Sequence, residues 1–380
     1  AVFTRKESMS KATGKAPAGK SDDFRRRRLS LTDVDTSEFP ETEPGLEKTP
    51  SKERARRMSM SPEMDQTPQQ DTLPFPLKTV GTYSCHGVEP GSRQGQTNAK
   101  INQDRGCVVY PFAKNYALFC VFDGHGQHGD KVSHYAMSTI PSTLEEKLAK
   151  GVKEKDALKA TFLKVDGDLK KDKTIDAELS GTTAVVLLYK FDETNKSVAR
   201  LWAANCGDSR AVLHSNNGKV TDITVDQKPN SPAEEARIRK FGGYVSPPEE
   251  EWGGPARVWL DANMTLPGLA MARSIGDHLV DKVGVVADPE VTEFVIDTTK
   301  EDMIIMASDG VWEFIDSEQA CKLLVKAQEA NKNVEDATFQ VTKLIETAAA
   351  KWRQEEGDYR DDITAICIKL RMLHECHFAS

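Results

Sequence analysis

Four short acidic turns, each beside the end of an apolar stretch, most constrain how this chain folds. They are Asp123-Gly124-His125-Gly126, Gly207-Asp208-Ser209-Arg210, Ser308-Asp309-Gly310 and Arg360-Asp361-Asp362. A chain leaving a buried strand carries its next side chains to a rim, where gathered carboxylates repel one another unless a cation lies between them. Oxygen ligands without a cysteine or histidine cluster favour Mg²⁺ or Mn²⁺ over Zn²⁺. A metal-dependent hydrolytic site is therefore the first hypothesis.

The composition is that of a globular protein with a substantial core. Of its 380 residues 38% are hydrophobic and 29% charged, and the net charge is −8. This acidity disfavours nucleic acid as a partner. No apolar run approaches the roughly 20 residues needed to cross a bilayer, and residues 1–20 lack the apolar centre of a secretory signal. We expect an intracellular protein, cytoplasmic and/or nuclear, with no membrane span.

The seven cysteines point away from disulfides and zinc. Their number is odd, they are scattered, and no two form a CxxC pair. Most lie in or beside apolar stretches, which favours buried, reduced thiols.

Residues 1–78 are expected to form a disordered tail, because this segment is rich in Ser, Thr, Pro and charged residues and shows no periodicity. Arg25 to Arg28 precede Ser30, and Arg54 to Arg57 precede Ser59, which suits basophilic kinases. Proline-directed kinases are suggested by Thr49-Pro50, Ser61-Pro62 and Thr67-Pro68. Kinases acting on the tail and a regulatory role for it are thus hypotheses. Chance matches, a nuclear address at Arg25 to Arg28, or a solvated charge run are the alternatives.

Short apolar runs bounded by turn residues predict strands. They are Thr79 to His86, Gly106 to Pro111, Tyr116 to Phe122, Thr182 to Tyr189, Val198 to Ala204, Arg210 to His214, Glu293 to Ile296, Met303 to Ala307 and Ile363 to Leu370. The spacing predicts helices over Lys131 to Leu148 with a break or bend at Pro141, Val152 to Leu179, Ser317 to Ala330, Val334 to Trp352, and a shorter one after Ser231. Blocks of strands flanked by paired helices favour an α+β layered sandwich over a doubly wound sheet.

Each acidic turn also has a purely structural interpretation. Asp-Gly pairs are common in turns, the turn at Asp208 suits a hairpin, and Ser308-Asp309 suits a helix cap. Two glycines flanking His125 directly after a buried strand favour function, since a histidine there can transfer a proton.

Seven motifs together carry a resemblance to a known family. They are Asn102-Gln103-Asp104-Arg105, Asp123-Gly124-His125-Gly126, Ser180-Gly181-Thr182-Thr183-Ala184, Asn205-Cys206-Gly207-Asp208-Ser209-Arg210, Ala272-Arg273-Ser274-Ile275-Gly276-Asp277, Ala307-Ser308-Asp309-Gly310-Val311-Trp312 and Arg360-Asp361-Asp362-Ile363-Thr364. In this order they resemble the type 2C, metal-dependent serine/threonine protein phosphatases. The resemblance covers Thr79 to Leu370.

The resemblance implies a four-layer α/β/β/α sandwich, with two central antiparallel β-sheets flanked by helices. The catalytic domain is then expected over 79–372, with a short C-terminal tail at 373–380. Residues 244–267 resemble the family's flap beside the active site. Its tryptophans, Trp252 and Trp259, either contact a peptide or regulator, or cover a small core of their own.

The resemblance also implies the roles of the site residues. Asp123 would bridge two Mg²⁺ or Mn²⁺ ions, Gly124 would offer its carbonyl, and Asp309 and Asp361 would hold one ion. His125 matches the general acid for the leaving alcohol.

Three further positions are implied to act around these ligands. Asp104 would orient a bound water, and Asp208, near Thr183, matches positions linked to a weaker third ion. The implied reaction is hydrolysis of phosphoserine and phosphothreonine in phosphorylated protein substrates, by water or hydroxide that the two ions activate. Such an enzyme serves signalling, and a monomer is expected.

Two positions depart from the family pattern. Gln103 stands where glutamate is frequent, which implies weaker or water-mediated binding of one ion. Ala99 stands where an arginine often grips the substrate phosphate, and the adjacent Lys100 is the candidate substitute. These departures keep open an alternative, a catalytically weak or silent phosphatase-like scaffold or binding module. A small-molecule phosphatase or nuclease is a third possibility.

Overall fold

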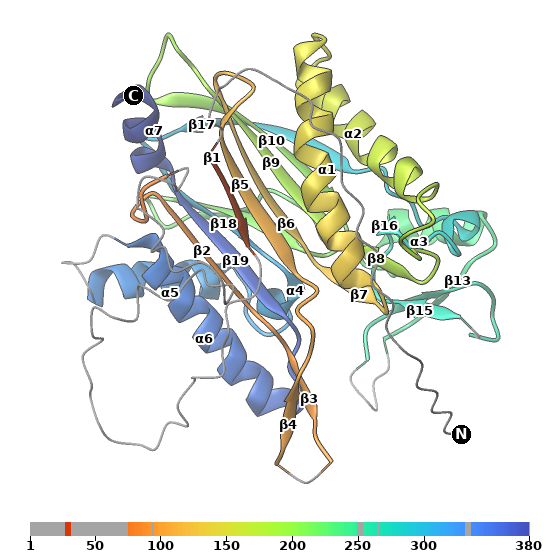
Figure 1. Cartoon of the computed structure of the whole chain (residues 1–380). Helices are drawn as coiled ribbons and strands as arrows, with labels where there is room; N and C mark the ends of the chain where they lie inside the picture. The colour runs from red at the N-terminus through yellow and green to blue at the C-terminus, as the bar shows by residue number, and fades with distance from the viewer. Residues whose placement is uncertain are drawn as a thin grey trace, which may run out of the picture.

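The fold is built around two antiparallel β-sheets that pack face to face, with helices on the outer side of each (Figure 1). The computed structural model describes the backbone of residues 27–31 and residues 75–92, 95–248, 254–264, 266–330 and 336–379. The six-stranded sheet has the order β1 (Arg27–Leu31), β5 (Arg105–Phe112), β6 (Tyr116–Phe122), β9 (Ala184–Phe191), β10 (Val198–Cys206) and β17 (Glu290–Asp297). The five-stranded sheet has the order β12 (Val220–Asp222), β11 (Arg210–Ser215), β18 (Glu301–Ala307), β19 (Ile363–Lys369) and β2 (Val80–Cys85).

Successive side chains of β6 are buried alternately in two cores, which explains why its sequence is apolar throughout. Leu118, Cys120 and Phe122 belong to the core beneath the outer helices, whereas Phe119 and Val121 belong to the core between the two sheets. Successive side chains of a strand point to opposite faces. A strand covered on both faces therefore needs apolar residues at every position.

The second sheet has the same two-sided burial. In β18, Ile304 and Met306 join the core between the sheets, while Ile305 joins a third core beneath the helices on the far side. Three apolar cores thus separate, in order, helices, sheet, sheet and helices.

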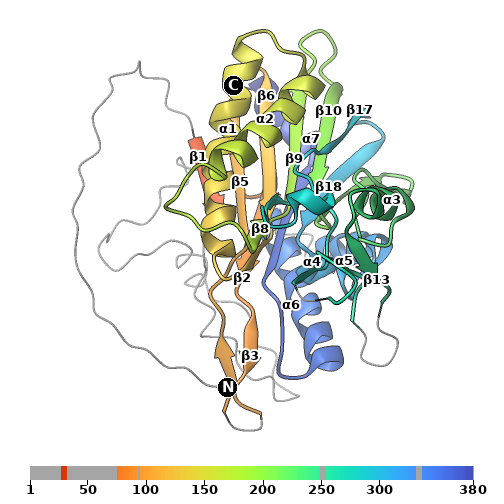
Figure 2. The same cartoon turned by 90° about the vertical axis from the view of Figure 1, so that its right-hand side faces the viewer.

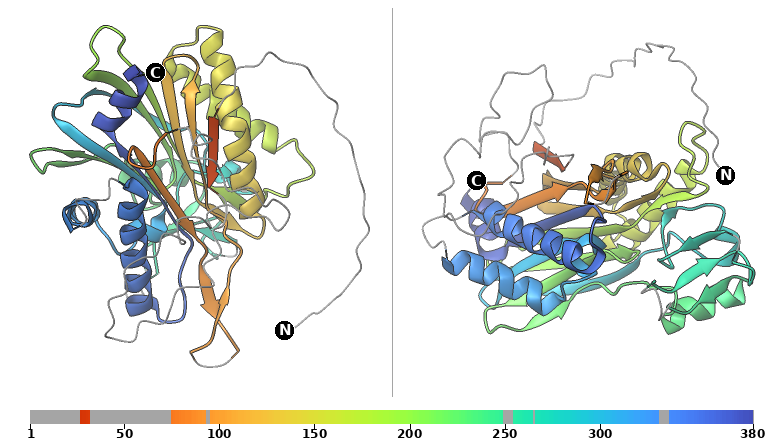
Figure 3. Two further views of the ribbon diagram at one scale, coloured as in Figure 1. Left: turned by 60° about the vertical axis from the view of Figure 1, so that its left-hand side comes forward. Right: turned by 90° about the horizontal axis from the view of Figure 1, so that it is seen from below.

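Two pairs of helices form the outer layers. Helices α1 (Gly129–Ala149) and α2 (Glu154–Leu169) cover the six-stranded sheet. Helices α5 (Ser317–Ala330) and α6 (Ala337–Glu356), drawn in blue, lie side by side outside the five-stranded sheet (Figure 3). The predicted α+β class with two antiparallel sheets is confirmed.

A smaller unit, built on α3 (Pro232–Lys240), lies beside the main sheets (Figure 2). It contains a three-stranded sheet of β13 (Tyr244–Ser246), β14 (Arg257–Trp259) and β15 (Pro267–Leu269), and it has its own apolar core. This unit contains the predicted flap. Trp252 lies outside the described residues. Trp259 donates its indole N–H to Ser246 Oγ and packs on Gly268, so it covers its own sheet.

Two helix predictions need correction. The predicted break at Pro141 is absent, because α1 continues through it; Met137 and Leu144 on either side of the proline are buried in one core. The helix predicted to reach Leu179 ends at Leu169, after which Asp172 accepts hydrogen bonds from the backbone and hydroxyl of Thr174. Such a side-chain turn competes with helix continuation.

The ends of the domain also differ from the expected boundaries. Phe75, assigned to the tail, is buried and stacks on Tyr110 with ring centroids 4.4 Å apart. Residues 373–380, expected as a tail, lie largely within α7 (Leu370–Ala379), where buried His374 lies 2.6 Å from the Tyr189 hydroxyl. These contacts involve residues far apart in the sequence, so local pattern does not reveal them.

Most of the expected tail, residues 1–26 and 32–74, lies outside the described residues, and so do Thr49, Ser59, Ser61 and Thr67. Ser30 falls in β1, whose backbone pairs with β5. All seven cysteines are free thiols, six of them buried, as predicted. No helix in the described part of the chain is both long and apolar enough to span a bilayer.

Candidate metal centre and catalytic site

The acidic turns meet at one end of the sandwich, and strand register explains why. Ala307, at the end of β18, pairs with Ala365 near the start of β19 and with Arg210 at the start of β11. Phe122, at the end of β6, pairs with Arg105 at the start of β5. The residues that flank these strand ends are Asp104, Asp123, Asp208, Asp309 and Asp361. All five therefore project from the same end.

Asp123 and Asp309 lie close together, because the charge of Asp309 is the strongest influence of any neighbouring charge on the Asp123 carboxyl group. Burial, followed by the charge of Asp309, raises the pKa of Asp123 well above its usual range. Burial and the charges of Asp208 and Asp361 raise the pKa of Asp309 to about 7. Buried like charges of this kind are stabilised by a cation, so the donor set suits a hard divalent ion.

The acidic residues do not form a finished cage. Within the described ranges, no three His, Cys, Asp or Glu side chains converge closely enough to constitute a metal-binding group. Two lysines hold carboxylates of the cluster instead. Lys100 Nζ lies 2.8 Å from Asp361 Oδ1, and Lys228 Nζ lies 2.7 Å from Asp208 Oδ2. Lys100, expected to contact substrate phosphate, is therefore paired with an expected metal ligand.

Asp104 and Asp362 are two further carboxylates of the acidic cluster. Ser308 donates a hydrogen bond to Asp104 Oδ2, while Asp104 Oδ1 is buried and has no hydrogen-bond partner among the described residues. Burial and the charge of Asp362 raise the pKa of Asp104. Asp362 accepts hydrogen bonds from the backbone N–H groups of Gly87 and Gln103, so it joins three loops of the site. Sequence reasoning gave Asp362 no role.

Gln103 uses its amide as a donor. Its Nε2 lies 2.8 Å from the Gly126 carbonyl oxygen, immediately after His125. A glutamate at this position cannot donate that hydrogen bond when ionised. The departure at Gln103 therefore has a local structural role in addition to any effect on an ion.

A second small sheet positions His125. Strand β7 (Gly124–Gly126) pairs with β8 (Ser180–Thr182), which pairs with β16 (Ile275–Gly276), so three sequence motifs become adjacent. His125 Nε2 lies 2.6 Å from Asp277 Oδ2, while its Nδ1 is buried and has no hydrogen-bond partner in the part of the chain that the structure describes. Burial would lower the pKa of His125, but Asp277 raises it above its ordinary value. A Cβ on Gly181 would lie 2.1 Å from Asp277 Oδ2, which explains a glycine there.

Thr183 makes hydrogen bonds to two turns of the site. Its Oγ1 accepts a hydrogen bond from the Asp123 backbone N–H and lies 2.7 Å from the Ser209 hydroxyl. It thereby links the turn of Asp123 to the turn of Asp208.

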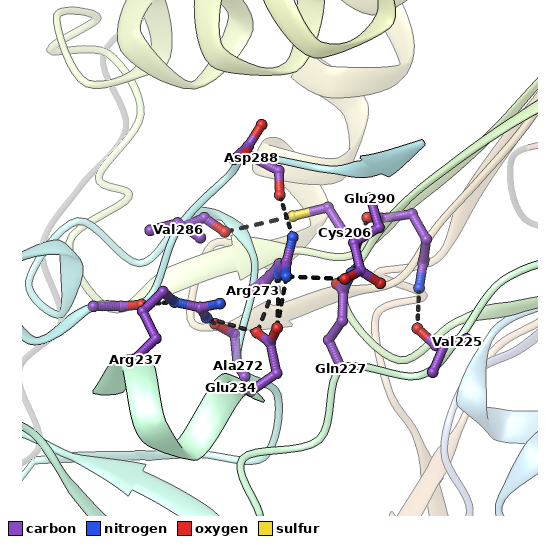
Figure 4. Close-up of polar contacts among 12 residues, drawn as sticks. Cys206, Val225, Gln227, Glu234, Arg237, Ala272, Arg273, Val286, Asp288 and Glu290 are labelled. Atoms are coloured by element: carbon purple, nitrogen blue, oxygen red, sulfur yellow. Dashed lines mark hydrogen bonds and ion pairs between the residues drawn. The ribbon is translucent and has the colours of Figure 1, made fainter. Parts of the chain in front are cut away.

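An ion-pair network fastens α3 to the main sandwich (Figure 4). Glu234, on α3, accepts hydrogen bonds from Arg273, and Arg237 contacts the same carboxylate at 2.7 Å. Arg273 also donates to the Asp288 carbonyl oxygen. Since Asp277 is only four residues beyond Arg273, the network anchors the loop that supports His125.

We expect Glu234→Gln to destabilise the protein by about 2–4 kcal/mol at pH 7, because two arginines that are only 11% and 20% exposed lose their shared counter-charge. Burial would raise the pKa of Glu234, but Arg273 and Arg237 lower it below 4.5. The stability that ionised Glu234 gives to the folded protein is thus present above pH 4.5 and is lost as the pH falls through the lowered pKa.

Urea unfolding between pH 4 and 7, followed by tryptophan fluorescence, measures this effect. Glu235→Gln is the matched control, since the exposed pair of Glu235 with Arg239 on the same helix is worth less than about 1 kcal/mol. Equal destabilisation by the two variants at pH 7 would contradict the assignment.

Comparisons with known proteins agree on one family. A family model for protein phosphatase 2C matches residues 92–356. The chain is 32% identical over 327 residues to "Probable protein phosphatase 2C 73" of Arabidopsis thaliana, covering 77% of this chain and 83% of the relative. It is 35% identical to "Probable protein phosphatase 2C 61" of Arabidopsis thaliana, covering 77% and 89%. A crystal structure of serine-threonine phosphatase 2C from Toxoplasma gondii has the same fold, with a TM-score of 0.60, 20% identity, and coverage of 76% and 94%.

Proposed function

The chain belongs to the protein phosphatase 2C family, and from this membership we propose that it hydrolyses phosphoserine and phosphothreonine in proteins with two Mg²⁺ or Mn²⁺ ions. One observation carries the metal assignment: the carboxylates of Asp104, Asp309 and Asp361 lie close enough to Asp123 for their charges to raise its pKa. Asp123, the Gly124 carbonyl, Asp309 and Asp361 would hold these ions, with Asp123 contributing to both.

When bound, the ions would supply a water nucleophile at neutral pH and stabilise charge on the phosphoryl oxygens. The chain's own residues do the remaining work. Asp104, fixed by Ser308, orients the nucleophile. His125, held by Asp277 at Nε2, keeps Nδ1 for transferring a proton to the leaving serine or threonine oxygen.

Lys100 and the tail complete the proposal. Lys100 is close enough to the ligands to contribute a positive charge towards a substrate phosphate, although its pairing with Asp361 opposes that role. Kinases acting on Ser30 and the other tail sites are proposed regulators.

The decisive experiment titrates Mn²⁺ while measuring hydrolysis of a phosphothreonine peptide by wild type and Gln103→Glu. We expect wild-type turnover, and a half-saturating Mn²⁺ concentration about three- to tenfold lower in the variant, because a carboxylate attracts a dication more strongly than an amide does. Loss of the hydrogen bond to Gly126 should also lower maximal turnover.

Gln127→Glu is the matched control, because it adds the same charge at an exposed position directly after Gly126. It should leave the half-saturating concentration within about twofold of wild type, given screening at exposed positions. No turnover by folded wild type at millimolar Mn²⁺ would reject the enzyme and favour the silent scaffold.

A further inference from the structure

Lys228 is held in a fixed place beside Asp208. The preceding residue, Gln227, accepts a hydrogen bond from the Gly207 N–H at its Oε1 and donates its own backbone N–H to the Gly207 carbonyl. The Ala272 N–H in turn donates to the Gln227 carbonyl. These bonds tie the start of the flap-bearing segment to the turn that carries Asp208, so the position of the lysine is set by the fold.

The two members of the Lys228–Asp208 ion pair differ in their burial and in their contacts. The Asp208 side chain is 1% exposed and that of Lys228 is 33% exposed. Asp208 Oδ2 contacts the ammonium group at 2.7 Å, but Asp208 Oδ1 is buried without a partner among the described residues. One oxygen of this carboxylate therefore remains available for a second positive charge.

Lys228 carries a positive charge at neutral pH, as an alkylammonium group ordinarily does, and its contact with the Asp208 carboxylate favours this charged form. A divalent ion that approaches Asp208 thus meets an ammonium group already in contact with the same carboxylate. At such short range, like charges repel strongly in a partly buried site.

We propose that Lys228 is a resident cation that weakens binding of the auxiliary divalent ion at Asp208. The inference rests on the proposed function. The ammonium group already supplies part of the counter-charge at Asp208, so this lysine sets how strongly a divalent ion binds there.

Lys100 provides an internal comparison. It lies 2.8 Å from Asp361, so it also neutralises a carboxylate of the cluster, but on a different ligand. Removing Lys100 should alter binding of the ion that Asp361 holds. Removing Lys228 should alter the ion at Asp208.

The test measures Mn²⁺ binding directly, by electron paramagnetic resonance of free Mn²⁺ and by calorimetry, with the full chain. Asp208→Asn identifies the binding class that belongs to Asp208, because that class should disappear. Lys228→Met should tighten the same class at least about tenfold. Lys228→Arg, which retains the charge, should stay within about twofold of wild type, and Lys100→Met should leave this class unchanged.

Thermal unfolding gives a second readout that is independent of activity. In EDTA, Lys228→Met should unfold at a lower temperature than wild type, because Asp208 is left without its counter-charge. Added Mn²⁺ should raise the midpoint of this variant more than that of wild type. Such a gain would show that the ion replaces the ammonium group.

Three results would overturn the inference: no binding class lost in Asp208→Asn, an unchanged class in Lys228→Met, or equal tightening in Lys228→Arg. Failure of the proposed function looks different. In that case wild type lacks turnover and the tight Mn²⁺ classes, whatever happens at Asp208.

Discussion

Asp309→Asn is expected to lower hydrolysis of a phosphothreonine peptide by at least about 10³-fold, or on the order of 4 kcal/mol of transition-state stabilisation. An amide is a weaker ligand than a carboxylate, and the charges of both Asp208 and Asp361 act on the carboxyl group of Asp309. The initial rate at saturating Mn²⁺ measures the loss.

The same variant should not be destabilised in EDTA. The pKa of Asp309 is raised from 3.8 to about 7 by burial and by neighbouring carboxylates. A carboxyl group whose folded-state pKa is raised destabilises the folded protein as the pH rises from its unfolded pKa towards its folded pKa. Asp309→Asn removes this penalty, so its advantage over wild type should grow between about pH 4 and pH 7.

Asp302→Asn is the matched control, because this aspartate lies on β18 near His214, away from the acidic cluster. It should retain activity within about threefold, as expected for a surface change. Loss of activity together with loss of stability in Asp309→Asn would instead assign Asp309 a structural role.

His125→Asn is expected to slow phosphothreonine-peptide hydrolysis by about 10²- to 10³-fold, and p-nitrophenyl phosphate hydrolysis by less than about tenfold. An alkoxide needs a proton in order to leave, whereas p-nitrophenolate leaves readily without one. Asp277→Asn should produce the same selectivity with a smaller loss, because it disturbs the hydrogen bond that orients His125. The ratio of kcat values for the two substrates is the measurement.

A second histidine–aspartate pair supplies the control. His278 follows Asp277 directly in the sequence, but its side chain is directed at α2. Its Nε2 lies 3.0 Å from Asp166 Oδ1 on that helix. His278→Asn should change the two substrates equally, if at all. Equal slowing of both substrates by His125→Asn would remove the general-acid assignment.

Segments whose burial follows a regular local pattern could be predicted closely from the sequence. The run from Tyr116 to Phe122 was predicted as a strand, and β6 has these same bounds. The amphipathic segment from Ser317 to Ala330 likewise matches α5. In each, local periodicity and burial agree. The packing of Phe75 and the helix α7 could not be predicted this way, because both depend on contacts with distant parts of the sheets.

Three site residues gave no usable signal on their own. Lys228 pairs with Asp208 across 20 positions, Asp277 pairs with His125 across 152, and Asp362 reaches the Gln103 backbone across 259. Asp277 belongs to one of the motifs that carry the family resemblance, yet the sequence does not indicate that it pairs with His125. No local pattern encodes which side chains meet after two sheets have packed.

The sequence by itself determined the kind of site: apolar strands that end in aspartates place hard oxygen ligands at a rim, and His125 follows one of them directly. That information is local, because strand periodicity and turn chemistry act over a few residues. Only the tertiary structure decided which charge faces each carboxylate. Packing of the two sheets brings Asp309, beyond β18, near Asp123, beyond β6, and loop packing places Lys100 on Asp361 and Lys228 on Asp208. Such pairings depend on distances between remote segments, which packing alone sets.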